Sequence, residues 1–170
     1  MTDVNKNKFF LLLGMVGAVI VIFGLTQPNA QLYYIFGAFL LLITAVYYKF
    51  LYFMALELVL ISGHTASLLG ISRILQMVLP IILCLQLLFF YAMTGHLNNI
   101  FVLIGILGVG LISIGFGFAY TWVFFIGSMS VAIYAFYLSY RKKKFALLWG
   151  SLNAIFAAVA LMELWDGRVW

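Results

Sequence analysis

The chain has 170 residues, of which 67% are hydrophobic and 8% charged, with nine Lys and Arg against four Asp and Glu and a mean hydropathy of +1.22. A soluble domain keeps about a quarter of its residues charged, so this composition excludes a soluble protein and predicts an integral membrane protein. The net charge of +5 requires no nucleic-acid partner, because anionic membrane lipids attract basic loops at about 1 kcal/mol per residue.

Seven apolar stretches are long enough to cross a membrane, since a hydrocarbon core of about 30 Å takes roughly 20 helical residues. The few polar or charged points of the chain place the predicted spans at 9–27, 31–48, 51–69, 73–93, 99–119, 121–140 and 145–165. No small-residue cleavage pattern precedes Pro28, so the first span is expected to be retained. The predicted fold is all-α, with residues 1–170 forming a single transmembrane domain.

The basic residues predict the orientation, because cytoplasmic loops hold the excess of Lys and Arg. With the N-terminus inside, seven of the nine fall on the cytoplasmic side: Lys6, Lys8, Lys49 and Arg141 to Lys144. Arg73 and Arg168 fall outside. We therefore predict an N-in, C-out topology. The single cysteine, Cys84, excludes an internal disulfide and is interpreted as a packing residue.

The chain contains two similar stretches 91 residues apart, FLLLGMVGAVIVIFG from residue 10 and FVLIGILGVGLISIG from residue 101, with five identities. Glycine-rich apolar helices can share five identities by composition alone, so a duplication requires that the following helices align as well. The second and sixth spans align at a spacing of 90, through Gly37, Ile43, Ala45 and Tyr47 with Gly127, Ile133, Ala135 and Tyr137. The third and seventh align at 91, through Ala55 and Leu56 with Ala146 and Leu147.

These alignments predict two three-helix repeats, 9–69 and 99–165. A basic loop follows the second helix of each, at Lys49 and at Arg141–Lys144. Three helices would invert the second copy, so the span 73–93 is interpreted as the linker that makes the copies parallel. In transporters built from parallel repeats, the substrate site lies near the bilayer midplane, where the repeats face each other.

The segment TWVFFIGSMSVAIYAFYLSYRKKKFALLWGSLNAIFAAVALMELW, from residue 121, resembles the second half of Pnu-type vitamin transporters. Its middle helix opens with Trp and Gly and contains a Tyr, and its last helix is polar and aromatic and ends in Trp. The Pnu family belongs to the SWEET and PQ-loop-like superfamily, which shares the three-plus-one-plus-three helix plan. The resemblance implies uptake of a vitamin-like solute, such as nicotinamide riboside, thiamine or riboflavin, by facilitated diffusion with cytoplasmic trapping by phosphorylation and without a cofactor. A SWEET-like sugar transporter is the alternative. The expected location is the bacterial cytoplasmic (inner) membrane.

The seventh span carries the first candidate substrate-binding residues. Five side chains fall within about 80° of helical arc and are expected to face inward: Trp149, Asn153, Phe156, Ala160 and Glu163. The Asn153 amide lies near mid-depth and suits a neutral polar solute, while Trp149 and Phe156 offer rings for stacking. Alternatively, Asn153 bonds a neighbouring helix, a contact worth about 0.6 kcal/mol.

The third span adds Glu57 and His64, seven residues apart on one helix face. An ionisable side chain within a span is a functional candidate by default. A proton relay between them is one interpretation. In the other, Glu57 reaches water beside Lys49 and His64 lies near the outer interface. No metal site is expected, because His64 and His96 fall at opposite sides of the membrane without clustered carboxylates or thiolates.

The sixth span contributes Tyr134, which lies deep enough for its hydroxyl to need a partner, and Trp122, which lies at the interface, where Trp commonly anchors a span. No nucleophile with a base is evident beyond the Glu57 and His64 pair, so an enzyme is not predicted. A non-catalytic accessory subunit also fits the hydrophobicity and charge, but it does not explain a parallel duplication. The sequence leaves a homo-oligomer open.

Overall fold

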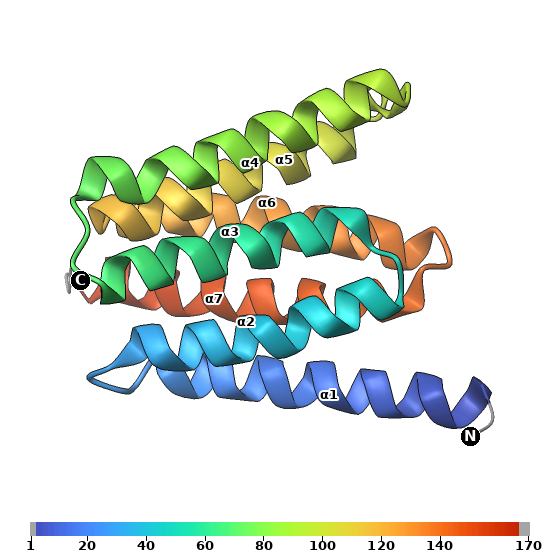
Figure 1. Ribbon diagram of the computed structural model, residues 1–170, viewed down its shortest axis with the longest axis horizontal. Coiled ribbons are helices and arrows are strands. Elements are labelled where there is room, and N and C mark those ends of the chain that lie inside the picture. The colour runs from blue at the N-terminus through green and yellow to red at the C-terminus, as the bar shows by residue number, and fades with distance from the viewer. Residues whose placement is uncertain (1–2, 167–170) are drawn as a thin grey trace.

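A computed structural model describes residues 3–166 as an all-helical bundle, with no strand in this range (Figure 1). Seven helices are long and apolar enough to cross a membrane, and two short 3₁₀ turns precede the fifth and the last of them. They are α1 (Asp3–Gly24), α2 (Ala30–Tyr47), α3 (Leu51–Leu68), α4 (Arg73–Met93), η1 (His96–Asn98), α5 (Ile100–Phe118), α6 (Thr121–Tyr140), η2 (Lys144–Ala146) and α7 (Leu147–Trp165).

The predicted spans agree with these helices to within a few residues, except at the start of the chain. Helix α1 begins at Asp3 instead of residue 9, because the polar segment DVNKNK continues the helix beyond its apolar part. Helix α7 begins at Leu147 after the turn η2, where the last span was predicted from residue 145. The seven-helix, all-α prediction is thus confirmed for the described residues.

The helices alternate in direction and define two ends of the bundle. The basic end holds the start of α1 and the connections at 48–50, 94–99 and 141–146, and the opposite end holds the connections at 25–29, 69–72 and 119–120 (Figure 1). Lys49 and the run Arg141–Lys144 therefore lie at one end, and Arg73 lies at the other.

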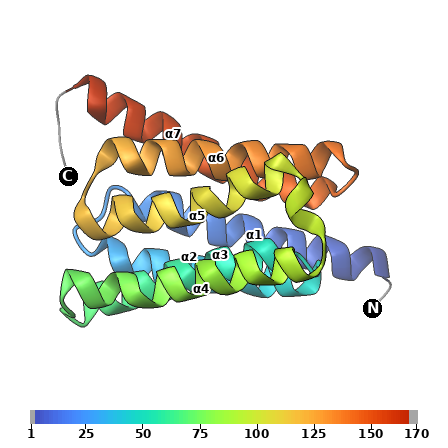
Figure 2. The ribbon, with the colours of Figure 1, turned by 90° about the horizontal axis from the view of Figure 1, so that it is seen from above.

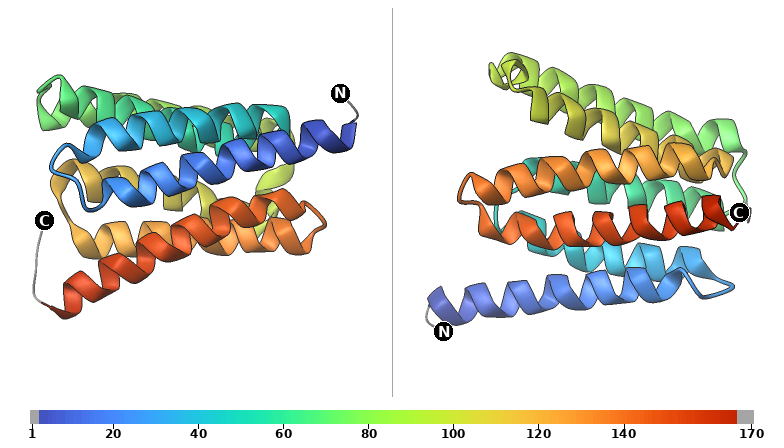
Figure 3. Two further views of the ribbon diagram at one scale, coloured as in Figure 1. Left: turned by 90° about the horizontal axis from the view of Figure 1, so that it is seen from below. Right: turned by 180° about the vertical axis from the view of Figure 1, so that it is seen from behind.

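Helices that follow each other in the chain pack together, with α2 between α1 and α3, and α6 between α5 and α7. Two further contacts join these sets, α1 with α7 and α3 with α5. Helix α4 packs only along α3 and α5 and lies at the edge of the bundle (Figures 2 and 3). In its apolar stretch 17% of the residues are buried, against 50% in α6, so α4 is peripheral.

Two loops at the basic end are built alike. Lys49 and Lys142 both adopt positive φ angles, 56° and 69°. In each case the next residue closes the helix C-terminus, with the Phe50 N–H donating to the Ala45 carbonyl at 2.9 Å and the Lys143 N–H donating to the Leu138 carbonyl at 3.0 Å. This left-handed C-cap satisfies carbonyl groups that the end of a helix leaves unpaired.

Glycines allow the closest helix approaches in the bundle. A Cβ atom on Gly17 would lie 2.8 Å from the carbonyl oxygen of Gly37, and one on Gly108 would lie 3.0 Å from the carbonyl oxygen of Gly127. Small residues at such crossings let two backbones meet, which is how membrane helices gain packing energy without a hydrophobic driving force. The α1–α2 and α5–α6 pairs therefore depend on these positions.

Gly127→Ala is expected to destabilise the fold by roughly 1 to 3 kcal/mol, the usual cost of forcing extra atoms into a packed site. The added Cβ would lie 2.6 Å from the Ile112 backbone nitrogen, which cannot move aside as a flexible side chain can. The measurement is thermal unfolding of purified protein in detergent. The control is Gly110→Ala, also within a helix, where a Cβ meets nothing within 4 Å. Equal melting temperatures for the two variants would contradict the packing described.

Burial differs between two residues that the sequence alignment pairs. Leu56 is 1% exposed, whereas Leu147, its predicted counterpart at a spacing of 91, is 52% exposed. A spacing of 93 would instead pair Leu56 with Trp149, which is 0% exposed, and the loop residues Lys49 and Lys142. The spacing between the third and seventh spans stays a prediction.

Candidate functional site

Four of the five residues on the predicted inward face of α7 are buried, and the fifth, Glu163, is partly exposed. Trp149, Asn153, Phe156 and Ala160 are each 5% exposed or less. The amide nitrogen of Asn153 donates to the Trp149 carbonyl one turn earlier, at 2.9 Å. The side-chain hydrogen bond of Asn153 is therefore made within its own helix. The interpretation in which Asn153 bonds a neighbouring helix is corrected for this donor.

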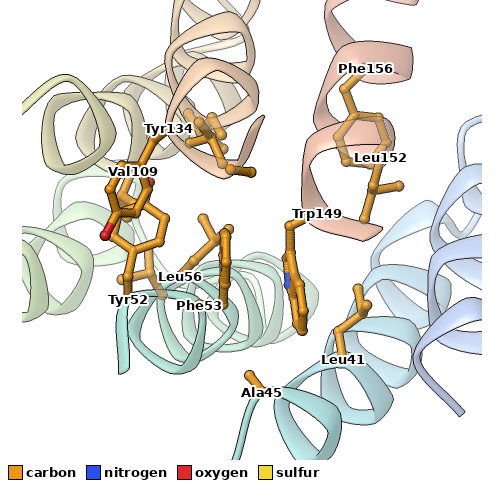
Figure 4. Close-up of a cluster of buried hydrophobic side chains, with 14 of the residues drawn as sticks. Leu41, Ala45, Tyr52, Phe53, Leu56, Val109, Tyr134, Trp149, Leu152 and Phe156 are labelled. Atoms are coloured by element: carbon orange, nitrogen blue, oxygen red, sulfur yellow. The ribbon is translucent and has the colours of Figure 1, made fainter. Parts of the chain in front are cut away.

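Glu57 and Trp149 join α3 to α7 in the interior. The Trp149 indole N–H donates to the Glu57 carboxyl at 2.8 Å. The Trp149 ring stacks on Phe53 with centroids 4.5 Å apart (Figure 4). Glu57 is 1% exposed. The interpretation in which Glu57 reaches water beside Lys49 is therefore wrong, because α3 turns this side chain toward α7 and not toward the loop.

An aromatic layer lies between Glu57 and the basic end. We define it as Tyr48, Phe50, Phe53, Phe145 and Trp149. Tyr48 stacks on Phe145 at 4.1 Å, and Phe50 meets the edge of the Trp149 ring at 6.0 Å. The layer combines residues of α3 and the loop before it with residues of η2 and α7, so it closes the bundle across both three-helix sets.

Tyr134 extends this closure on the side of α5 and α6. Its ring packs against Tyr52 with centroids 4.4 Å apart, and the Tyr52 hydroxyl donates to the Gly105 carbonyl at 2.7 Å (Figure 4). The Tyr134 hydroxyl has a partner in Tyr91 of α4. The predicted partner of the buried Tyr134 hydroxyl is thus another side chain of the protein. The Tyr134 ring also lies beside Phe53 of the aromatic layer.

A cavity of about 230 Å³ occupies the opposite end of the bundle. We call it the main cavity. It is bordered by residues of the five helices α2 to α6 and of two connections at this end: Leu25, Ala30, Gln31, Tyr34, Val59, Leu60, Gly63, His64, Ser67, Gln76, Met77, Pro80, Ser113, Gly115, Phe116, Gly117, Ala119, Thr121 and Phe124. Leu25, Ala30 and Ala119 lie at helix ends, so the cavity reaches the end of the bundle.

The wall of the main cavity is mostly apolar and carries several neutral polar side chains. Gln31, Ser67, Gln76, Ser113 and Thr121 supply amides and hydroxyls, and the described lining residues include no Asp, Glu, Lys or Arg. The Thr121 hydroxyl is buried and has no hydrogen-bond partner within the described part of the chain. Donors and acceptors of this kind recognise neutral polar groups.

A kink-forming residue adds to this wall. Pro80 lies inside α4 and is buried, and it borders the main cavity together with the half-buried Gln76. Proline has no N–H, so the carbonyl of the residue four positions earlier, Gln76, loses its usual helical partner. The Gln76 side-chain amide donates to the Ile71 carbonyl at 2.6 Å.

A smaller cavity of about 20 Å³ lies deeper in the bundle. Glu57, His64, Asn153 and Phe156 all border it. It shares five lining residues with the main cavity: Tyr34, Leu60, His64, Phe116 and Phe124. The His64 ring lies between Tyr34 and Phe116, at 4.7 and 4.8 Å, so these rings separate the two spaces.

The predicted site residues thus divide into three groups. Glu57, His64, Asn153 and Phe156 meet at the small cavity, whereas Trp149 and Tyr134 belong to the closure near the basic end. Trp122 is 58% exposed and borders neither cavity. Sequence reasoning missed most of the main cavity, because its residues come from five helices and two connections and share no spacing. Pro80, one of only two prolines, was the one available signal.

The fold and the site define a seven-helix integral membrane protein with a cavity at one end. Within residues 3–166, no three His, Cys, Asp or Glu side chains gather closely enough to hold a metal ion. Comparison with protein-family models, curated proteins and solved structures finds no match.

Proposed function

We propose that the protein is a membrane transporter for a small neutral solute, which it binds in the main cavity. The observation that carries the proposal is the asymmetry of the bundle. A mostly apolar cavity with neutral polar side chains in its wall reaches one end, and an aromatic layer closes the other end below it. Alternating access requires a site that is open to one side and closed to the other.

Equivalent contacts in the two three-helix sets support a parallel duplication, with α4 as the linker. Four contacts between α1 and α2 have a counterpart between α5 and α6, in which the first residue lies 91 positions later and the second lies 90 positions later. The contact of Phe10 with Tyr47 corresponds to Phe101 with Tyr137, and Gly14 with Thr44 corresponds to Gly105 with Tyr134. In the same way, Gly17 with Gly37 corresponds to Gly108 with Gly127, and Gly24 with Tyr34 corresponds to Gly115 with Phe124. The contacts between the sets also correspond, α1 with α7 and α5 with α3. A duplication of this kind provides two units that can rock against each other.

The orientation proposed from the sequence, N-in and C-out, would place the main cavity on the extracytoplasmic side. The support is the gathering of Lys49 and Arg141–Lys144 at the basic end, together with Lys6 and Lys8 on the first turns of α1. The cavity would then be open to solute arriving from outside, as uptake requires.

Alkaline phosphatase fused after Trp170, a reporter that is active only outside the cytoplasm, is expected to be active. The reason is the excess of basic residues at one end together with the odd number of spans, seven, which puts the two termini on opposite sides. The matched control is the same reporter fused in the 141–143 loop, where activity is expected to be absent. Activity of the loop fusion and silence of the terminal one would reverse the orientation.

The size and lining of the main cavity favour a solute with one ring and several neutral polar groups. Its volume of about 230 Å³ lies below the roughly 300 to 1,000 Å³ of sites for drug-sized ligands. Tyr34, Phe116 and Phe124 offer ring faces. We therefore propose a vitamin-like or nucleoside-like solute, as in Pnu-type transporters, with a SWEET-like sugar as the alternative.

A binding screen tests this proposal directly. Purified protein in detergent is heated with B vitamins, nucleosides and sugars, and a ligand that binds only the folded state raises the melting temperature. Nicotinamide, uridine and glucose represent the three neutral classes. A shift with one class identifies the solute type. A non-catalytic accessory subunit, the alternative of another class, would show no shift with any of them.

A further inference from the structure

Glu57 has an unusual environment for a carboxyl group. One oxygen accepts the Trp149 indole N–H at 2.8 Å. The other oxygen, Oε2, is buried and has no hydrogen-bond partner among residues 3–166. Glu57 lies in the second turn of a membrane-spanning helix and is 1% exposed, so its unsatisfied oxygen faces the interior of the bundle and not a lipid headgroup or a loop.

No charge nearby compensates an ionised Glu57. Among the described residues that border the small cavity, the titratable ones besides Glu57 are His64 of its own helix and Tyr34 of α2. Helix α7 contributes Trp149 and Asn153, which are neutral, and the bordering residues of α5 and α6 are apolar. An unpaired carboxylate in such a place is strongly disfavoured, so the carboxyl group is held in its protonated form.

The route to Glu57 leads from one side only. The small cavity, at about 20 Å³, has room for one water molecule, and it borders the main cavity at His64 and Phe116. On the other side, Phe53 and Trp149 cover Glu57 toward the basic end. A proton from the main cavity therefore has to pass only the wall of Tyr34, His64 and Phe116, in which the His64 imidazole can relay it, while the aromatic layer blocks the basic end.

We propose that Glu57 is a proton-binding site loaded from the main cavity, so that solute movement through this protein is coupled to proton movement. The coupling rests on the proposed transport function, whereas the proton site itself does not. When the aromatic layer parts, the Trp149 to Glu57 hydrogen bond breaks and water from the basic end reaches the carboxyl group. The O–H bond then dissociates, the proton passes to that water, and the electron pair remains on the carboxylate, which is reprotonated from the main cavity in the next cycle.

Infrared spectroscopy of the purified full chain tests the proton site without any solute. A protonated carboxyl has a C=O stretching band distinct from that of a carboxylate, and this band is expected in the wild type at pH 7. It should shift in D₂O, since the site exchanges with the cavity. Glu57→Gln should abolish the band, and the matched control Glu163→Gln, on α7, should retain it. Absence of the band at pH 7, or its survival in Glu57→Gln, would overturn the proposal.

Uptake by vesicles tests the coupling. Vesicles containing the wild type are given labelled nicotinamide, uridine or glucose with an inward or no pH gradient. For a transported probe, the gradient should drive accumulation above the external concentration by several-fold, and Glu57→Gln should equilibrate the probe without accumulating it. Uptake that ignores the gradient would overturn the coupling. If none of the probes enters, the transport function fails for these classes, and the infrared band alone decides the proton site.

Discussion

Trp149→Ala is expected to lower the free energy of unfolding by about 3 to 5 kcal/mol, the cost of removing a large buried aromatic side chain. Trp149 is 0% exposed, stacks on Phe53 at 4.5 Å and bonds Glu57 at 2.8 Å. The truncation would therefore leave a cavity between α3 and α7 and remove the one hydrogen-bond donor that the Glu57 carboxyl has among residues 3–166. Thermal unfolding in detergent measures the loss.

Two further variants separate packing from hydrogen bonding in this prediction. Trp149→Phe keeps a ring against Phe53 but removes the indole N–H, so it should cost about 1 to 3 kcal/mol, the penalty of an unsatisfied buried acceptor. Trp122→Ala, at a side chain that is 58% exposed, should cost much less. A Trp149→Ala protein as stable as Trp122→Ala would show that the aromatic layer does not hold α3 to α7.

The architecture was largely predictable because lipid imposes a simple rule on the chain. Every backbone polar group must be satisfied within a span, so apolar stretches of about 20 residues become helices and the few polar residues mark their ends. The exceptions have local causes. Residues 3–8 are mostly polar yet form the start of α1. Helix α7 begins only at Leu147, after the 3₁₀ turn η2. Hydropathy reveals neither feature.

The site was predictable only in part, because helical periodicity tells which face is buried but not what that face meets. The stripe containing Trp149 and Asn153 is buried as predicted. Whether such residues border a cavity or fill the core depends on contacts between helices far apart in the sequence. Here the Trp149 indole donates its hydrogen bond to Glu57, 92 residues earlier in the chain. Likewise, the main cavity arises where five helices and two connections leave space between them, which no single segment encodes.

Gly63→Phe is expected to weaken solute binding by at least about tenfold, or ~1.4 kcal/mol, while leaving the fold intact. Gly63 borders the main cavity, and a Cβ at this position meets nothing within 4 Å. The phenyl ring would therefore enter the cavity without a clash and take the place of the solute. The measurement is the ligand-induced shift in melting temperature with nicotinamide, uridine and glucose.

The matched control for this variant is Gly110→Phe. Gly110 also lies within a membrane-spanning helix, and its Cβ position also meets nothing within 4 Å, but it borders neither cavity. Its variant should bind as the wild type does. Equal binding by a well-folded Gly63→Phe protein would place the solute site outside the main cavity.

Solute uptake by vesicles that contain only this protein tests the central claim most directly. Purified protein is reconstituted with labelled nicotinamide, uridine and glucose outside, and entry is compared among the wild type, Gly63→Phe and protein-free vesicles. We predict saturable entry of at least one probe with the wild type and entry at the protein-free level with Gly63→Phe. Entry at the protein-free level for all three probes with the wild type, or equal uptake by the two proteins, would contradict the account of a transporter that loads its solute in the main cavity.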